Sequence, residues 1–382
     1  MAHTSSPKLR IAVIFGGRSG EHEVSLMSAR SVIAALDPEK YEIFPVGITH
    51  AGNWFVGENV LEALEQGKTE SLDHAFIFPE PDHPGLYAIR NISSRSGAER
   101  TQHVKLTDLD VIFPVLHGTF GEDGTMQGLF ELADVAYVGA GVVGSAVGMD
   151  KGIFKDVMRA NDIPGVDWII LRRSEIEQDM GAVIRKAEAL GAYPLFTKPA
   201  NLGSSVGISK CSNRSDLGEG LMEAASFDRR ILIERGLVDV REIEVSVLGN
   251  DNPIASVCGE VLPSREFYSY ESKYVDGTSG LVIPAEIPAE ISDRIRDLAV
   301  RAYKAIDCAG MARADFFLEK GTNRVMLNEL NTLPGFTSIS MYPKLWNVTG
   351  VSYPELVDRL IRLAIDRKAE RDRTVREFRR DK

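Results

Sequence analysis

The sequence predicts an α/β fold built around a parallel sheet, with α+β character over the whole chain. In the first third, short apolar strands alternate with loops and helical segments, a pattern typical of parallel sheets covered by helices. The composition, 44% hydrophobic and 26% charged residues, is that of an ordinary globular protein. A length of 382 residues predicts two to three domains.

The charge balance and the cysteines exclude several classes of protein. The chain carries 44 basic and 55 acidic residues, a net charge of −11, which argues against nucleic acid as a partner. No apolar run approaches the roughly 20 residues of a membrane helix, and the N-terminus does not resemble a signal peptide, so we expect a cytoplasmic protein without membrane attachment. The widely spaced Cys211, Cys258 and Cys308 predict small buried side chains.

The elements of the first third follow from apolar runs and turn residues. Ile11–Phe15 is a run of five apolar residues ended by glycines, which predicts a buried strand. Residues 67–103 are irregular and contain polar runs, and we interpret them as an insertion on the surface. The other elements expected here are a helix over 25–36 and strands over 41–48 and 110–116.

The remaining two thirds are expected to contain further strands and helices. A helix over 149–160 is followed by Pro164, and Ser174 is placed to cap a second helix that reaches about Leu190. Residues 267–280 are polar, aromatic and punctuated by glycine, which predicts a mobile loop. The expected strands cover 195–198, 206–210, 231–234, 243–248, 254–261, 311–318 and 324–331, and the later helices cover 290–306 and 354–369.

Two glycine-rich loops are candidates for ligand binding. Residues 16–25, GGRSGEHEVS, join a strand to a helix and so present backbone N–H groups, although a tight turn with helix-capping residues explains them equally well. This loop contains neither G-x-G-x-x-G nor the G-K-[ST] of a P-loop. Residues 203–207, GSSVG, follow Lys198 and resemble a phosphate cradle between strands, with an ordinary hairpin turn as the competing interpretation.

The GSSVG segment also fits the G-x-S-x-G elbow of serine hydrolases, with Ser205 as the nucleophile. A strand-like segment follows it, whereas the elbow requires a helix. All seven histidines lie at or before His117, so the order Ser, Asp, His cannot be made. A serine hydrolase is therefore disfavoured.

The strongest group of candidate residues lies on a predicted hairpin of residues 311–318 and 324–331. Asp315, Glu329 and Asn331 are expected to share one face of it with Arg313, and their oxygens are hard ligands suited to Mg²⁺. A solvated Arg–Glu pair is the alternative. We favour the metal because Leu327 and Phe317 are expected on the same face. The expected register pairs Phe317 with Val325, Asp315 with Leu327 and Arg313 with Glu329.

Six motifs occur in a fixed order along the chain. They are residues 16–25 (GGRSGEHEVS), 117–124 (HGTFGEDG), 149–151 (MDK), Lys198-Pro with 203–207 (GSSVG), 267–274 (FYSYESKY) and 328–335 (NELNTLPG). Over about residues 10–365 the chain thereby resembles the D-alanine–D-alanine ligases, a family with the ATP-grasp fold. The resemblance implies a Rossmann-like domain over 1–148, a small central ATP-grasp subdomain over 149–240, and a C-terminal antiparallel-sheet subdomain over 241–382.

The resemblance also implies a reaction. ATP phosphorylates the carboxylate of one D-alanine, and the amine of a second attacks the acyl phosphate to give D-alanyl-D-alanine for peptidoglycan. The implied partners are D-alanine, ATP, two Mg²⁺ ions for which Mn²⁺ substitutes, and a second copy of the chain. The alternatives are a ligase that uses D-lactate or D-serine second, and a nucleotide-binding module without activity.

Individual residues receive roles from the same resemblance. Glu21 would hold the ammonium of the first D-alanine, Arg313 and the Gly335 N–H would stabilise the oxyanion, and Ser340 would hold the second carboxylate. Glu21, Ser204 and Tyr274 would form a catalytic trio, and His117 would contact substrate. The implied metal ligands are Asp315, Glu329 and Asn331. The implied ATP contacts are Lys151, Lys198, Ser205, Glu234, Arg235, Glu242 (with Glu244 as a rival), Tyr268, Lys273, Phe317 and Asn328.

Overall fold

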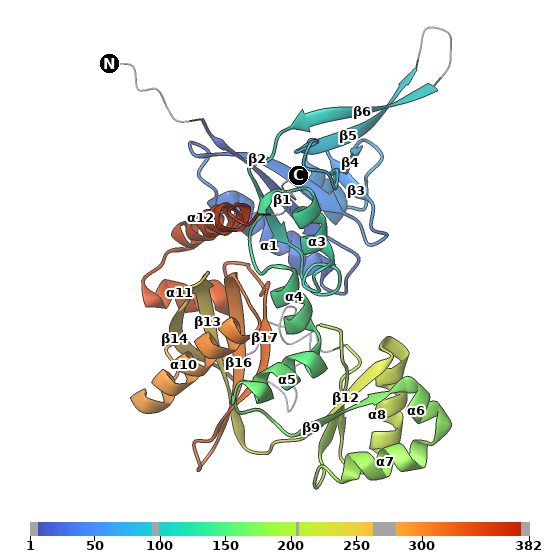
Figure 1. Cartoon of the computed structure of the whole chain (residues 1–382), viewed down its shortest axis with the longest axis vertical. Helices are drawn as coiled ribbons and strands as arrows, with labels where there is room; N and C mark the ends of the chain where they lie inside the picture. Colours follow the sequence, from blue (N-terminus) through green and yellow to red (C-terminus); the bar gives the residue numbers. More distant parts are fainter. Residues whose placement is uncertain (1–6, 94–98, 204–205, 263–279, 376–382) are drawn as a thin grey trace, which may run out of the picture.

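Three sheets follow one another along the chain in the computed structural model, which describes residues 7–93, 99–203, 206–262 and 280–375. Figure 1 shows the first sheet at one end of the molecule and the other two side by side at the opposite end. No helix within these ranges is long and apolar enough to cross a membrane.

The first sheet has eight strands in the order β6-β5-β4-β3-β2-β1-β7-β8. Strands β2, β1, β7 and β8 are parallel, which confirms the sheet predicted for the first third, and the strands from β2 to β6 are antiparallel. Its strands are β1 Leu9–Gly16, β2 Tyr41–Ile48, β3 Trp54–Val56, β4 Asp73–Phe76, β5 Leu86–Ser93, β6 Glu99–Thr107, β7 Val111–Val115 and β8 Ala136–Tyr137. The helices of this region are α1 His22–Ala35, α2 Val60–Glu65, α3 Thr125–Leu132 and α4 Val142–Met149.

The prediction that residues 67–103 are irregular was wrong, and their interpretation as a surface insertion stays a prediction. Strands β4, β5 and most of β6 lie in this segment and extend the sheet, and β5 and β6 form a long hairpin that projects from the body (Figure 1). The hairpin buries three consecutive residues of β5, Leu86, Tyr87 and Ala88, while residues 101–107 of β6 are exposed or half-buried. It therefore lacks the apolar alternation by which half-buried strands are recognised.

The second sheet has four antiparallel strands in the order β11-β10-β12-β9. Helices α6, α7 and α8 pack on one face over a core that includes Leu195, Ile231 and Ile233. The opposite face carries Phe196, Lys198 and Glu234. The elements are α5 Lys151–Ala160, β9 Trp168–Arg172, α6 Arg173–Gln178, α7 Met180–Glu188, β10 Leu195–Pro199, β11 Ser209–Cys211, α8 Arg214–Phe227 and β12 Arg230–Arg235.

The single helix expected from Ser174 to Leu190 is two helices. The chain leaves helical geometry at Asp179, whose carboxylate accepts a hydrogen bond from the Ala182 N–H at 2.9 Å and starts α7. At the start of α6 the Glu175 carboxylate accepts the Arg172 N–H at 2.8 Å, so Ser174 is not the cap. A second acidic cap inside a helical pattern is the signal for this break.

The third sheet has five antiparallel strands in the order β15-β14-β13-β16-β17. Apolar residues of β13, β16 and β17 face α10 and form a core with it, and that core also takes in Phe154 and Met158 of α5. The elements are β13 Val240–Gly249, β14 Ile254–Leu262, β15 Gly280–Val282, α10 Ala289–Ala305, β16 Gly310–Glu319, β17 Val325–Asn331, α11 Met341–Thr349 and α12 Tyr353–Asp372.

The C-terminal helix α12 packs against the first sheet, although it follows the third sheet in sequence. One apolar core contains residues of β1, β7 and α1 together with Trp346 of α11 and Leu356, Leu360 and Ile361 of α12. This core holds the glycine-rich loop after β1 in a fixed position relative to the third sheet.

Candidate active site

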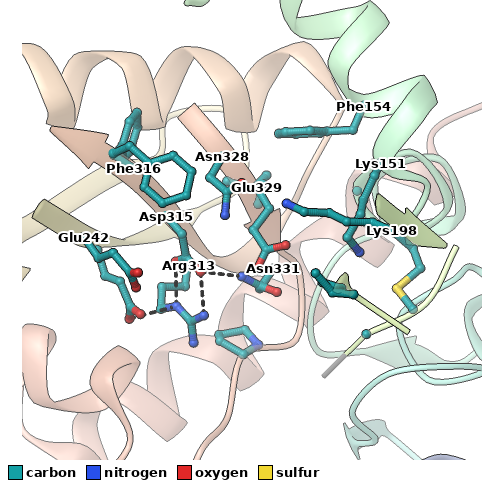
Figure 2. A pocket seen from close by; sticks show the side chains of 18 of the residues that line it. Lys151, Phe154, Lys198, Glu242, Arg313, Asp315, Phe316, Asn328, Glu329 and Asn331 are labelled. Carbon is teal, nitrogen blue, oxygen red and sulfur yellow. Dashed lines mark hydrogen bonds and ion pairs between the residues drawn. The ribbon is translucent and has the colours of Figure 1, made fainter. Parts of the chain in front are cut away.

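A cleft between the second and third sheets, closed at one end by loops of the first, collects most of the predicted site residues (Figure 2). Each sheet contributes charged side chains to it, and apolar residues of the second and third sheets form its walls. The predicted residues that line it are Glu21, His117, Lys151, Lys198, Glu234, Arg235, Glu242, Arg313, Asp315, Phe317, Asn328, Glu329, Asn331 and Gly335.

Strand β13 supplies two carboxylates to the cleft because its residues alternate between two environments. Ile243 and Val245 are buried in the core under α10, so Glu242 and Glu244 lie on the opposite face. Glu242 stands opposite Phe317 on β16, and Glu244 stands opposite Asp315. Both glutamates line the cleft, and Glu244 forms an ion pair with Arg313.

Arg313 ties the carboxylates of the third sheet together. Its Nε lies 2.9 Å from Glu244 and donates to Asp315 Oδ1 at 2.7 Å, and its second nitrogen donates to Asp315 Oδ2 at 2.7 Å. The side chains of Arg313, Glu244 and Asp315 are 14%, 9% and 15% exposed, so the charges are largely removed from water. Glu244, the rival residue, thus forms an ion pair with the arginine, and Glu242 lines the cleft on the same strand.

The register predicted for the β16–β17 hairpin was wrong, although the four candidate residues do share a face. Near the turn Leu318 pairs with Val325, whereas Asp315 pairs directly with Glu329 and Arg313 with Asn331. A β-bulge that leaves Asn328 without an opposite residue separates the two registers.

The bulge also changes which residues are buried. Leu327 was expected on the site face, but it lies in the core under α10 together with Leu330. Because of this extra residue, the alternation between core-facing and cleft-facing residues changes phase along β17. As a result Asp315 and Glu329 are direct neighbours across the strands rather than diagonal ones.

The pair Asp315 and Glu329, with Asn331 beside it, could hold a cation. The Asn331 amide nitrogen donates to Asp315 Oδ2 at 3.0 Å. Among the described residues no three His, Cys, Asp or Glu side chains gather closely enough to form a complete metal cage. A cation here would therefore share its coordination shell with a ligand, as Mg²⁺ usually does with substrate phosphates.

Two lysines face these carboxylates from the other side of the cleft. Lys151 lies at the start of α5, and its ammonium donates to the carbonyl of Leu202 at 2.6 Å. Burial lowers the pKa of Lys151. Lys198 on β10 forms an ion pair with Glu234 on β12, and although burial opposes its charge, Glu234 raises the pKa of Lys198 overall.

The glycine-rich loop after β1 brings Glu21 to the end of the cleft. Gly16 has φ of +87°, and a Cβ there would lie 2.1 Å from the Ile48 carbonyl oxygen, so only glycine fits this turn. Ser19 accepts the Glu21 N–H at 3.0 Å and donates to the His117 carbonyl at 2.8 Å. A Cβ built on Gly203 would lie 3.2 Å from Glu21 Oε2, so the loops of the first and second sheets meet here.

His117 connects the first sheet to the segment after β17 through both ring nitrogens. Nδ1 lies 2.9 Å from the Leu333 carbonyl and therefore donates to it, which leaves Nε2 to accept from Ser28 Oγ at 3.0 Å. Ser28 Oγ in turn accepts the Phe336 N–H at 3.3 Å. Burial lowers the pKa of His117, in keeping with a neutral ring. This arrangement fixes the backbone on both sides of Gly335.

Glu122 makes a parallel connection that the sequence did not single out. Its two carboxylate oxygens accept the N–H groups of Gly118 and Leu333, each at 2.9 Å. Burial and the nearby Glu21 raise the pKa of Glu122 to about 8, against the effect of the two N–H donors. The only signal in the sequence is its place in the HGTFGEDG motif.

The structure does not place five of the predicted residues, and it places a sixth, Ser340, outside the cleft. Ser204, Ser205, Tyr268, Lys273 and Tyr274, and with them most of the loop expected over 267–280, lie outside the described residues. Ser340 precedes α11 and contacts Thr337, whose N–H donates to Ser340 Oγ at 3.0 Å, and it does not line the cleft.

The three-sheet architecture and the cleft between the antiparallel sheets define the class: this is an ATP-grasp fold. The family models for the "D-ala D-ala ligase N-terminus" and "D-ala D-ala ligase C-terminus" match residues 10–140 and 157–362. The chain therefore belongs to the D-alanine–D-alanine ligase family.

Individual relatives agree with this assignment. The D-alanine–D-alanine ligase of Thermoanaerobacter pseudethanolicus is 50% identical over 370 residues, which cover 96% of this chain and 99% of that protein. Its counterpart in Caldicellulosiruptor bescii is 46% identical over 364 residues, 95% and 97% of the two chains. Among solved structures, the D-alanine–D-alanine ligase of Coxiella burnetii is 35% identical, with a TM-score of 0.78 over 96% of this chain and 98% of that one. VanG D-Ala:D-Ser ligase of Enterococcus faecalis is 34% identical, with a TM-score of 0.80 over 94% and 100%.

Proposed function

We propose that this chain is an ATP-dependent D-alanine–D-alanine ligase that makes D-alanyl-D-alanine for the cell wall. The observation that carries the proposal is the meeting of three kinds of group in one cleft. Lys151 and Lys198 offer charges for phosphates, Asp315 and Glu329 offer oxygens for a cation, and Glu21 offers a carboxylate for an ammonium. Each sheet supplies one kind, so the site exists only when all three are assembled.

This combination suits ligation through an acyl phosphate. A carboxylate is a poor electrophile, and transfer of a phosphoryl group from ATP converts one of its oxygens into a leaving group. The amine of the second D-alanine then attacks, and inorganic phosphate leaves. Because ATP, the acyl phosphate and phosphate are all anions, positioned cations are the main requirement in a protein of net charge −11.

Arg313 and the backbone around Gly335 are proposed to stabilise the tetrahedral oxyanion. Arg313 is held by Glu244 and Asp315, so it is oriented before substrate arrives. The Leu333 N–H and carbonyl are bound by Glu122 and His117, which fixes the chain two residues before Gly335. Because both ring nitrogens of His117 are already bonded, we assign that residue to positioning and not to direct substrate contact.

Asp315, Glu329 and Asn331 fit a divalent cation. Carboxylate and amide oxygens are hard donors, and Asp315 already attracts the positive guanidinium of Arg313. We propose Mg²⁺ in two positions, with Mn²⁺ as a substitute, and these three residues as the protein ligands. When bound, the ions neutralise phosphate charge during transfer.

The test is phosphate release from ATP and Mg²⁺ with D-alanine, with L-alanine, and with D-alanine plus D-lactate or D-serine, followed by product analysis. We expect turnover and dipeptide with D-alanine alone and little turnover with L-alanine. Equal turnover with the L-isomer would contradict the assignment. The homodimer stays a prediction, which light scattering tests.

A second candidate is a ligase that joins D-alanine to D-serine or D-lactate. The similarity to VanG D-Ala:D-Ser ligase, at 34% identity over 94% of this chain, supports this second candidate. The curated relatives at 46% to 50% identity favour the dipeptide with two D-alanines. A mixed ligase would yield mostly the mixed product when D-alanine and D-serine are supplied together.

A further inference from the structure

Helix α5 carries a second buried lysine, Lys155, that has no role in the site described above. It lies one helical turn after Lys151, so the two side chains are on the same side of α5. Lys155 is only 6% exposed. Removing an ammonium from water costs several kcal/mol unless a partner compensates, so the position of Lys155 requires explanation.

The partner of Lys155 is Glu234, which is itself only 4% exposed. Lys155 Nζ contacts Oε1 of this carboxylate, and Lys198 Nζ contacts Oε2. Burial opposes the charge on Glu234, but Lys155 and Lys198 together lower the pKa of its carboxyl group to about 2. The single negative charge of Glu234 is therefore paired with two ammonium groups, and the three side chains together carry a net positive charge.

The two lysines differ in their access to the cleft. Lys198 lines it, whereas Lys155 is not among the described residues that do. The start of α5 is also fixed to the second sheet, because Asp150 caps the helix and forms an ion pair with Arg230 of β12. A bound phosphate can attract Lys198 away from Glu234, while Lys155 stays in place behind the carboxylate.

The surroundings of Glu234 suit a flat apolar ligand. Phe196 stands directly opposite Glu234 on β10. Leu237, which follows Glu234 on the chain, and Val166, which precedes its neighbour Trp168 on β9, also line the cleft. Binding sites for planar rings are apolar with a few placed polar groups, and Glu234 is such a group. An ionised carboxylate only accepts hydrogen bonds, so it selects a base that presents a donor.

We propose that Lys155 is a positioning residue for nucleobase specificity, which keeps Glu234 ionised and in place once Lys198 has turned to the nucleotide phosphates. This inference rests on the proposed function, because it takes the cleft to be the ATP site. Adenine presents an amino donor at the position where hypoxanthine presents a carbonyl acceptor. Without Lys155, Glu234 either retains Lys198 or takes up a proton, and in both cases the preference for adenine weakens.

The experiment compares dissociation constants for ADP and for the hypoxanthine nucleotide IDP, measured by calorimetry without turnover. We expect Lys155→Met to weaken ADP binding at least tenfold and to change IDP binding much less, so that the ADP preference shrinks by about the same factor. Lys155→Arg retains the charge and should restore most of the preference. Lys186→Met, an exposed lysine on α7 paired with Glu175, is the matched control and should change neither constant.

A purely structural role for Lys155 would weaken ADP and IDP binding equally, and that result overturns the proposal. If Lys155→Met does not fold, the double variant Lys155→Met with Glu234→Gln removes both charges of the buried Lys155–Glu234 pair and should fold. This double variant should bind ADP and IDP with similar affinity, and a retained preference for ADP would be contrary evidence. Dipeptide synthesis by the wild type is measured separately. A wild type that binds ADP but makes no dipeptide refutes the proposed function alone.

Discussion

At the scale of single residues, the cleft is organised by charges that are paired before any ligand arrives. Glu234 is held by two lysines, and Asp315 and Glu244 share Arg313. The two lysines thereby keep the buried Glu234 carboxylate ionised. Ligand binding then exchanges one charged partner for another instead of introducing an unpaired charge, which keeps the cost of desolvation low.

Glu329→Gln tests the cation site with a change of charge and little change of shape. We expect turnover to fall at least about 100-fold and half-saturation to require more Mg²⁺, because a hard oxygen ligand is lost. Stability should change by less than about 1 kcal/mol. Glu290→Gln, on the exposed side of α10, is the control and should behave as wild type. Normal turnover with normal Mg²⁺ dependence would rule out the ligand role.

Glu122 makes a prediction about pH. Because its pKa is raised from 4.5 to about 8, the folded protein binds one more proton than the unfolded chain between these values. The free energy of unfolding should therefore fall as pH rises through this window, by up to about 1.4 kcal/mol per pH unit. Glu122→Gln should remove this slope. Urea unfolding at several pH values measures it, and parallel curves for the two proteins would refute the shift.

At the scale of elements, the two halves of the first sheet differ in their relation to the cleft. The loops after β1 and β7 reach the cleft, whereas no described residue from β2 to β6 lines it. The hairpin of β5 and β6 points away from the cleft (Figure 1). Its length is thus free to vary without disturbing the site.

Replacing residues 91–101 by Asn-Gly between Arg90 and Gln102 should leave the turnover number within about twofold of wild type. Arg90 and Gln102 are paired in the hairpin, and Asn-Gly forms the tight turn that joins paired strands. Thermal unfolding checks that the shortened protein folds. A large loss of turnover in a folded protein would show that the hairpin contributes to the site.

At the scale of the whole molecule, α12 joins the two ends of the chain. Asp358 on this helix accepts the Tyr41 hydroxyl at 2.6 Å and pairs with Lys40 at 2.8 Å, next to the core shared by α1, β1 and α12. Burial opposes its charge, but the hydrogen bonds from Lys40 and Tyr41 lower the pKa of Asp358. Its stabilising effect is therefore complete above the ordinary aspartate range and is lost as pH falls through the lowered pKa.

Asp358→Ala should lower the free energy of unfolding by about 1–3 kcal/mol at neutral pH, because the buried Tyr41 hydroxyl loses its partner. ADP affinity should not change, since Asp358 does not line the cleft. The control is Glu370→Ala, which removes an exposed pair with Arg373 and should cost about 0.5 kcal/mol or less. Equal effects of the two variants would show that α12 is not held by this contact.

The sequence by itself determined the local elements and the chemical kinds of group in the site. Ile11–Phe15 lies within β1, the helix expected over 290–306 agrees with α10 to within one residue, and Arg313, Asp315, Glu329 and Asn331 share a face as predicted. These features depend on periodicity over a few residues, which a single segment encodes completely. The hairpin of β5 and β6 escaped prediction because the buried residues of β5, Leu86, Tyr87 and Ala88, are consecutive and do not alternate with exposed ones.

Only the tertiary structure decided which of these groups are partners. The bulge at Asn328 set Asp315 opposite Glu329. The pairing of β13 with β16 brought Glu244 to Arg313, and the packing of α5 placed Lys155 behind Glu234. Each pairing joins segments that lie between 14 and 79 residues apart, and no local pattern specifies it. The reason is physical: alternation fixes which face a side chain takes, whereas its partner depends on how separate sheets and helices pack to bury their apolar faces.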